Sequence, residues 1–153
     1  MGEFFGSIYT ALFEGLFGIN LADYLWGLTS QDGANLYIGI GLWMFGVSLL
    51  VAVLFYYIIN HPRLNTWWGW GIFMIINAMV NFCLGIWWTL SDLWAGDMEV
   101  YDKETRQMVT FVTEGDCLSF GIANAILSLF AFFIISMAIK WKSTNASQAP
   151  FNK

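Results

Sequence analysis

Charged residues are scarce in this sequence. Asp, Glu, Lys and Arg together make up 11% of its 153 residues, whereas hydrophobic residues make up 58%. Soluble proteins carry about 25% charged residues, so the composition predicts an integral membrane protein. The length leaves room for three membrane spans and one modest extramembrane loop, which we expect to form a single membrane domain of residues 1–153. The six Lys and Arg residues and the net charge of −5 argue against a nucleic-acid partner, since neutralising phosphates needs clustered positive charge.

Histidine and the catalytic patterns that use it are nearly absent. His61 is the only histidine, and it has no Cys or carboxylate nearby, whereas an ordinary metal site needs several ligands. We therefore expect no metal, and no cofactor other than bound lipid. A tetrapyrrole at His61 stays open, because one histidine can be sufficient for such a ligand. The sequence has no Ser-His-Asp, HExxH, GxSxG or P-loop pattern, so we expect a protein that is not an enzyme and has no catalytic residues.

Cysteine occurs only at Cys83 and Cys117. With a rise of about 1.5 Å per helical residue, the two lie at depths that differ by roughly 8 to 10 Å. That separation is beyond the reach of a disulfide. We therefore expect two free thiols.

Three long runs contain no charged residue, namely residues 36–59, 67–90 and 118–139. Each is long enough to cross a hydrocarbon core of about 30 Å, which takes about 20 helical residues. The expected fold is an all-α integral membrane protein with three transmembrane helices. Pumps, proton-coupled transporters and voltage sensors depend on ionisable groups inside their spans, so the runs argue against those classes. Tryptophans near the ends of the runs are expected to mark the two membrane surfaces: Trp67, Trp68, Trp70, Trp87, Trp88 and Trp141.

Residues 3–28, which precede the first run, show a different pattern. Polar residues recur there at three- and four-residue spacing, at Glu3, Ser7, Thr10 and Glu14. The pattern predicts an amphipathic helix that is too short and too polar to span, and that would lie in the membrane interface. Packing of this helix against its own bundle is the alternative, and the pattern favours neither. Asn20 or Asp23 is expected to cap a second short interfacial helix.

The loop of residues 91–117 is acidic, and its strand-forming residues on both sides of a polar turn are compatible with a small β-hairpin. All eleven Asp and Glu residues lie in this loop or in the N-terminal segment. The basic residues outside them are Arg63, Lys140, Lys142 and Lys153. Because Lys and Arg in short loops are retained in the cytoplasm, we predict that the N-terminus and the 91–117 loop are external and that the 140–153 tail is cytoplasmic. The predicted location is a bacterial inner (plasma) membrane.

Polar side chains inside the runs indicate contacts between helices, because lipid offers them no hydrogen-bond partner. Counted along the helices, Asn77 and Asn81 lie at roughly 15 and 21 Å from the cytoplasmic edge, and Ser128 and Asn124 at roughly 18 and 24 Å. We therefore predict a polar intramembrane seam of Asn77, Asn81, Asn124 and Ser128, with Ser48 near the same depth. The seam either joins the helices or lines a pore or a small ligand site. Close helix packing is expected at the small-xxx-small pairs Ser48 with Ala52 and Gly121 with Ala125.

These features favour a non-enzymatic integral membrane subunit that self-associates, or that anchors and assembles a larger membrane complex. Its expected partners are membrane lipids, together with further copies of the chain or other subunits of a membrane complex. Two alternatives stay open. One is a homo-oligomeric channel or pore lined by Asn and Ser side chains, and the other is an accessory subunit of a membrane enzyme or pigment complex.

Overall fold

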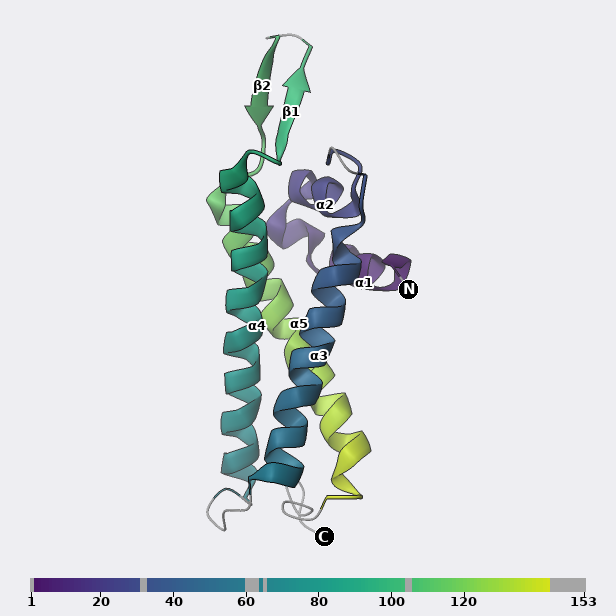
Figure 1. The fold of residues 1–153 in the computed structure, drawn as a ribbon, viewed down its shortest axis with the longest axis vertical. Coiled ribbons are helices and arrows are strands. Elements are labelled where there is room, and N and C mark those ends of the chain that lie inside the picture. Colours follow the sequence, from purple (N-terminus) through teal and green to yellow (C-terminus); the bar gives the residue numbers. More distant parts are fainter. Residues whose placement is uncertain (1, 31–32, 60–63, 65, 104–105, 144–153) are drawn as a thin grey trace. The chain divides into compact units, whose positions relative to one another are not determined.

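A computed structural model of the chain describes residues 2–30, 33–59, 64, 66–103 and 106–143, and it is mostly helical (Figure 1). His61 and the segment 144–153 therefore lie outside the described residues. The elements in chain order are α1 (Gly2–Phe17), α2 (Ile19–Trp26), α3 (Leu36–Val53), the π-helical turn η1 (Leu54–Ile58), α4 (Trp67–Ala95), β1 (Glu99–Asp102), β2 (Gln107–Thr110) and α5 (Glu114–Lys140).

Three helices are long and apolar enough to cross a membrane, which is consistent with an integral membrane protein. They are α3 with η1 (Leu36–Ile58), α4 and α5, and they confirm the three helices expected from the uncharged runs. The last turn of the first is wound as a π-helix, in which the Ile59 N–H donates to the Leu54 carbonyl at 2.9 Å.

The helix α5 begins at Glu114, ahead of the expected start at Leu118. A capping box explains the difference. The Thr113 N–H donates to Asp116 Oδ2 at 2.8 Å, and the Asp116 N–H donates back to Thr113 Oγ1 at 3.3 Å. These reciprocal bonds satisfy main-chain donors that the first helical turn would otherwise leave unpaired.

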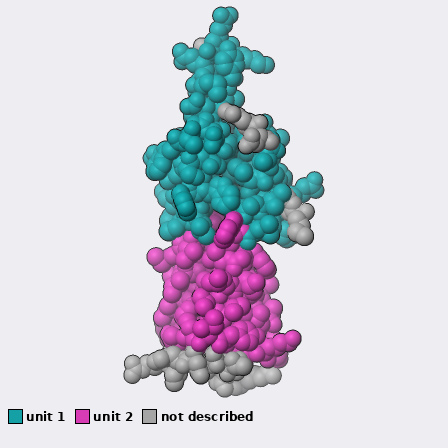
Figure 2. Space-filling model, in the orientation of Figure 1, with its two compact units in different colours: residues 1–42, 82–123 teal, residues 43–81, 124–153 magenta. Residues whose placement is uncertain are grey.

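The described chain groups into two compact units (Figure 2). Unit 1 comprises residues 1–42 and 82–123, and unit 2 comprises residues 43–81 and 124–153. Each of the three long helices therefore contributes one part to each unit.

Stacked aromatic rings form the core of unit 1. The Tyr9 ring of α1 stacks on the Tyr37 ring of α3 and on the Phe120 ring of α5, with centroids 5.4 Å apart in both pairs. Phe17, at the end of α1, meets Phe120 edge-on at 5.3 Å. Burial raises the pKa of Tyr9 above its ordinary value, so its phenol stays neutral. One face of α1 is thereby packed inside unit 1, whereas Phe4, Leu12 and Leu16 remain exposed.

The junction of α1 and α2 is a single glycine. Gly18 has φ +84°, a left-handed conformation that glycine adopts without steric cost, and it is the N-cap of α2. The expectation that Asn20 or Asp23 caps this helix is wrong, because α2 begins at Ile19 and no side chain bonds to its cap. A direct turn from one helix into the next leaves no room for a capping side chain.

The hairpin expected in the 91–117 loop is present. Strands β1 and β2 pair antiparallel, with Glu99 opposite Thr110 and Tyr101 opposite Met108, and they extend beyond the end of α4 (Figure 1). An isolated two-stranded sheet is marginally stable. Met98 and Val112, at the base of the hairpin, are buried and border a small hollow that Asn20 of α2 also lines. The base of the hairpin therefore lies against α2.

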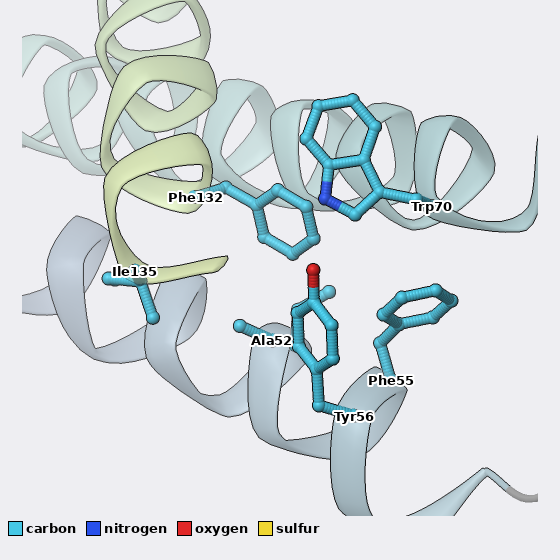
Figure 3. Close-up of a cluster of buried hydrophobic side chains, with 7 residues drawn as sticks. Ala52, Phe55, Tyr56, Trp70, Phe132 and Ile135 are labelled. Carbon is cyan, nitrogen blue, oxygen red and sulfur yellow. The ribbon is translucent and has the colours of Figure 1, made fainter. Parts of the chain in front are cut away.

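An apolar cluster forms the core of unit 2 (Figure 3). Ala52, Phe55 and Tyr56, from α3 and η1, face Trp70 of α4 and the α5 residues Phe132 and Ile135. Val51 completes the buried set. The Trp70 Nε1–H donates to Ser136 Oγ at 3.3 Å, which satisfies the polar atom of a ring that is only 7% exposed.

Candidate functional site: a buried amide network

Two asparagines lie one helical turn apart on α4 and both are fully buried in unit 2. Asn77 Nδ2 donates to the Ser128 carbonyl of α5 at 3.0 Å. Asn81 Nδ2 donates back along α4 to the Asn77 carbonyl at 3.0 Å and to Asn77 Oδ1 at 3.2 Å. The first bond joins the two helices, and the others orient the two amides relative to each other.

A third asparagine joins the network from α5. Asn124 Nδ2 donates to the Asn81 carbonyl at 2.7 Å. The two helices are therefore linked in both directions, because each supplies an amide donor and each supplies a main-chain acceptor. We call Asn77, Asn81, Asn124 and the Ser128 carbonyl the amide network. Hydrogen bonds between membrane helices contribute about 0.6 kcal/mol on average and at most about 1.7, so the network specifies the pairing more than it drives it.

Asn81 Oδ1 is buried and has no hydrogen-bond partner among the described residues. Reversing the amide would not help, because Oδ1 would then face the two Asn77 oxygens that Nδ2 now bonds. A buried acceptor without a donor costs about 1–3 kcal/mol, so the Asn81 side chain retains a destabilising oxygen beside its favourable amide bonds.

The serines of the predicted seam use their hydroxyls locally. Ser48 Oγ donates to the Met44 carbonyl of its own helix at 2.9 Å, and Ser128 Oγ donates to the Ala125 carbonyl at 2.7 Å. Such back-bonding satisfies a hydroxyl within one helix. The structure thus brings Asn77, Asn81, Asn124 and the Ser128 main chain into one network, whereas the Ser48 hydroxyl is not part of it.

Most of the small residues in the predicted packing motifs are buried within one copy of the chain. In unit 2, Ser48 and Ala52 are fully buried. In unit 1, Gly121 packs against α4, where an added Cβ would come within 2.4 Å of Ile86 Cγ1 and 3.2 Å of the Phe82 carbonyl. Ala125 is half-buried. Three of these four positions therefore serve contacts within one copy of the chain.

The six tryptophans predicted to mark the membrane surfaces differ in their exposure. Four of the rings are exposed, namely those of Trp67, Trp68, Trp87 and Trp141. Trp88 is half-buried beside Gly39 in unit 1. Trp70 differs, because its ring packs in the core of unit 2 and its Nε1–H bonds to Ser136 rather than to a membrane surface.

Residues missed by the sequence patterns line an acidic cavity in unit 1. Tyr24 Oη donates to Asp92 Oδ2 at 3.2 Å, and both side chains border a cavity of about 240 Å³ that Asp97 also lines. Composition assigned both aspartates only to an acidic loop. A local signal was nevertheless present, since Asp92 follows Trp88 by one helical turn and falls on the same helix face.

Metal-binding and redox groups are sparse in the part of the chain that the structure describes. No cluster of three or more His, Cys, Asp or Glu side chains there is arranged to hold a metal ion. Cys83 and Cys117 are both free, the first exposed and the second buried.

Comparison with known proteins returned no relative. No protein-family profile matches the chain, and no curated protein and no solved structure matches it.

Proposed function

We propose that this chain is a non-enzymatic integral membrane subunit, which associates with further copies of itself or with other subunits of a membrane complex. The proposal rests on one observation: the asparagine side chains of the long helices point into the bundle. The amides of Asn77, Asn81 and Asn124 are buried within one copy and donate to oxygens of their own chain. This arrangement stabilises a scaffold, because these amides are used in contacts within the bundle rather than on its outer surface.

The outer surface of unit 2 supports association. Trp43 and Leu50 of α3 are exposed, and Gly46 lies between them on the same helix face. A Cβ added at Gly46 would meet no atom within 4 Å. An exposed glycine between large apolar side chains allows a second helix to approach closely, which is the geometry that membrane helices use to associate.

Mass measurement in native lipid tests this proposal. We expect the extracted protein to have the mass of an oligomer or of a complex with other subunits. Gly46→Leu should shift the population towards the single chain, because its side chain has room within the protomer but blocks close helix approach. Gly15→Leu is the matched control, since a Cβ added at Gly15 of α1 also meets no atom within 4 Å. A single chain without a copurifying protein would overturn the proposal.

A pore lined by Asn and Ser is the competing function. It receives less support, because a lumen between copies would require these side chains on the outer surface of each copy, and they are buried. Conductance in planar bilayers distinguishes the two functions. We expect no current from the parent protein, and a current that Asn77→Leu or Asn81→Leu abolishes would establish the pore.

The membrane arrangement is also a proposal. The N-terminal helices would lie in the external interface, supported by the exposed Phe4, Leu12 and Leu16 of α1. The distribution of basic residues supports an external hairpin and a cytoplasmic C-terminus in a bacterial inner membrane. Labelling of Thr110→Cys and Ser143→Cys in intact cells with a membrane-impermeant maleimide tests it. Only Thr110→Cys should react, and the reverse pattern would invert the topology.

A further inference from the structure

The outer edge of strand β2 is open in the part of the chain that the structure describes. The sheet has two strands, β1 and β2, so the main-chain groups on the far side of β2 face no neighbouring strand. The helix α4 has 29 residues and is about 43 Å long, which exceeds a hydrocarbon core of about 30 Å. The hairpin extends beyond the end of this helix (Figure 1), so lipid tails do not cover the open edge.

The two edges of the hairpin differ in charge. Strand β1 carries Glu99 and Asp102, whereas β2 has the sequence Gln-Met-Val-Thr and carries no charge. The strands pair one to one from Glu99 to Asp102, so no bulge interrupts β2. Charged side chains, proline and bulges are the usual means by which a protein prevents a further strand from pairing with an edge. The edge of β1 has such protection and the edge of β2 has none.

Apolar side chains lie next to this unprotected edge. Met108 of β2 is 50% exposed, and Tyr101, directly opposite it on β1, is 56% exposed. Residues that lie directly opposite each other share one face of a sheet, so the two side chains form a single apolar strip. Phe111, immediately after β2, is also exposed. A strand added to β2 would cover this surface and would pair the open main-chain groups.

The charges at the two ends of the edge indicate which strand fits. Arg106 precedes β2, whereas Glu99 lies opposite Thr110 at the other end and Glu114 begins α5 four residues later. The edge is therefore positive at the hairpin turn and negative at its base. Copies in one membrane share one orientation, so the β2 strands of two copies would run parallel and would bring Arg106 of one copy beside Arg106 of the other. Like charges at the same level make a second copy a poor fit.

We propose that the β2 edge binds an extended segment of another protein as a third strand, with Lys or Arg at the end of the segment that lies beside Glu99 and Glu114. Main-chain hydrogen bonds to β2 would supply affinity, and side chains packed on Met108 and Tyr101 would add to it. Pairing of basic residues with the two carboxylates fixes which end of the segment lies at the base of the hairpin. This edge is separate from the α3 face around Gly46, and its binding does not depend on the assembly proposed above.

Synthetic peptides titrated against the intact protein in lipid nanodiscs test this edge, with binding followed by fluorescence anisotropy of the labelled peptide. The probe is Thr-Val-Thr-Val-Thr with two lysines at its N-terminus or at its C-terminus, because an added strand runs in either direction. One control replaces the lysines by glutamates. Another carries N-methyl groups on the Thr and Val residues, which removes their main-chain donors. We expect one lysine version to bind about tenfold or more tightly than both controls. Equal binding of either control, or no binding of either lysine peptide, would overturn the proposal.

Substitutions connect that binding to β2. Met108→Lys should weaken binding of the lysine peptide by about tenfold, because it adds a charge beside the new strand. Tyr101→Lys is the matched control, since it adds the same charge on the same face but on β1. Thr110→Lys repeats the test on β2 if Met108→Lys disrupts the hairpin. Equal weakening by the β1 and β2 substitutions, or normal binding by both β2 variants, would contradict binding at this edge.

Thr110→Cys, made together with Cys83→Ser, tests whether a second copy occupies the edge instead. We expect no disulfide between copies in native membranes under mild oxidation, because Arg106 of each copy would repel that of the other. Efficient cross-linking through the new cysteine would overturn the proposal of a different protein as the partner.

Discussion

Asn124 of α5 donates its Nδ2 hydrogen to the main-chain oxygen of Asn81 on α4 at 2.7 Å, which is the shortest bond in the amide network. The acceptor is a main-chain carbonyl of α4, so the bond forms only when the Asn124 side chain lies level with that carbonyl. A slip of one helix along the other would move this carbonyl away from the amide. The pair therefore defines the register of α4 and α5 in unit 2.

Asn124→Ala should lower the free energy of unfolding by about 1–2 kcal/mol, because it removes an interhelical donor and leaves a small cavity. The effect is measured by unfolding the protein in a denaturing detergent and recording the loss of its helical circular dichroism signal. Asn20→Ala is the matched control, since Asn20 is an exposed amide on α2. Equal stability of Asn124→Ala and the parent would show that the bond does not contribute.

Asn77→Ala should destabilise the protein by about 1 kcal/mol more than Asn81→Ala. Both substitutions remove amide bonds, but Asn77 uses its nitrogen and its oxygen, whereas the Asn81 oxygen has no donor among the described residues. Loss of that unpaired oxygen offsets part of the cost at Asn81. The same unfolding measurement compares them, and the opposite order would mean that Asn81 Oδ1 has a partner in the membrane.

Gly121→Ala should destabilise the protein by about 1–3 kcal/mol, because the new methyl group would collide with Ile86. Ile86→Ala, combined with Gly121→Ala, should recover part of the loss by removing the opposing atoms. Gly46→Ala is the control, since its surroundings are open and alanine is the better helix former by up to about 1 kcal/mol. Stability is again read from detergent unfolding. Equal effects of the two glycine substitutions would contradict the packing of Gly121.

Cys83 should react with a lipophilic maleimide in the folded protein, whereas Cys117 should react only after unfolding. The first thiol is exposed and the second is fully buried in unit 1. Mass spectrometry of the labelled protein counts the adducts before and after denaturation. Cys83→Ser removes the fast site and serves as the control. Rapid labelling of that variant would show that the Cys117 region opens in the native state.

Much of the secondary structure follows from local pattern. An uncharged run of about 20 or more residues can satisfy its main-chain groups in a membrane only as a helix, so the three long helices were predictable. The hairpin was predictable from two short runs of strand-forming residues around a polar turn. The predicted start of α5 was too late, because an apolar run marks only the membrane segment and not the capped turn that precedes it. The Thr113 and Asp116 residues that form this cap are nevertheless a local sequence pattern.

Depth along a helix could be counted from the sequence, and it predicted that Asn77, Asn81, Asn124 and Ser128 lie at similar levels. Depth does not say which way a side chain turns around its helix. For that reason only the structure could place Trp70 in a core, direct the Ser48 hydroxyl to its own helix and leave Asn81 Oδ1 without a donor among the described residues.

The sequence by itself determined the elements that depend on neighbours along the chain: the helical runs, the hairpin and the one-turn spacing of the two asparagines. The tertiary structure decided the pairings across the chain, such as Tyr24 with Asp92 and Gly121 with Ile86. The physical reason is that main-chain hydrogen bonding is local, whereas a side chain finds its partner only after the helices have packed in one particular rotation.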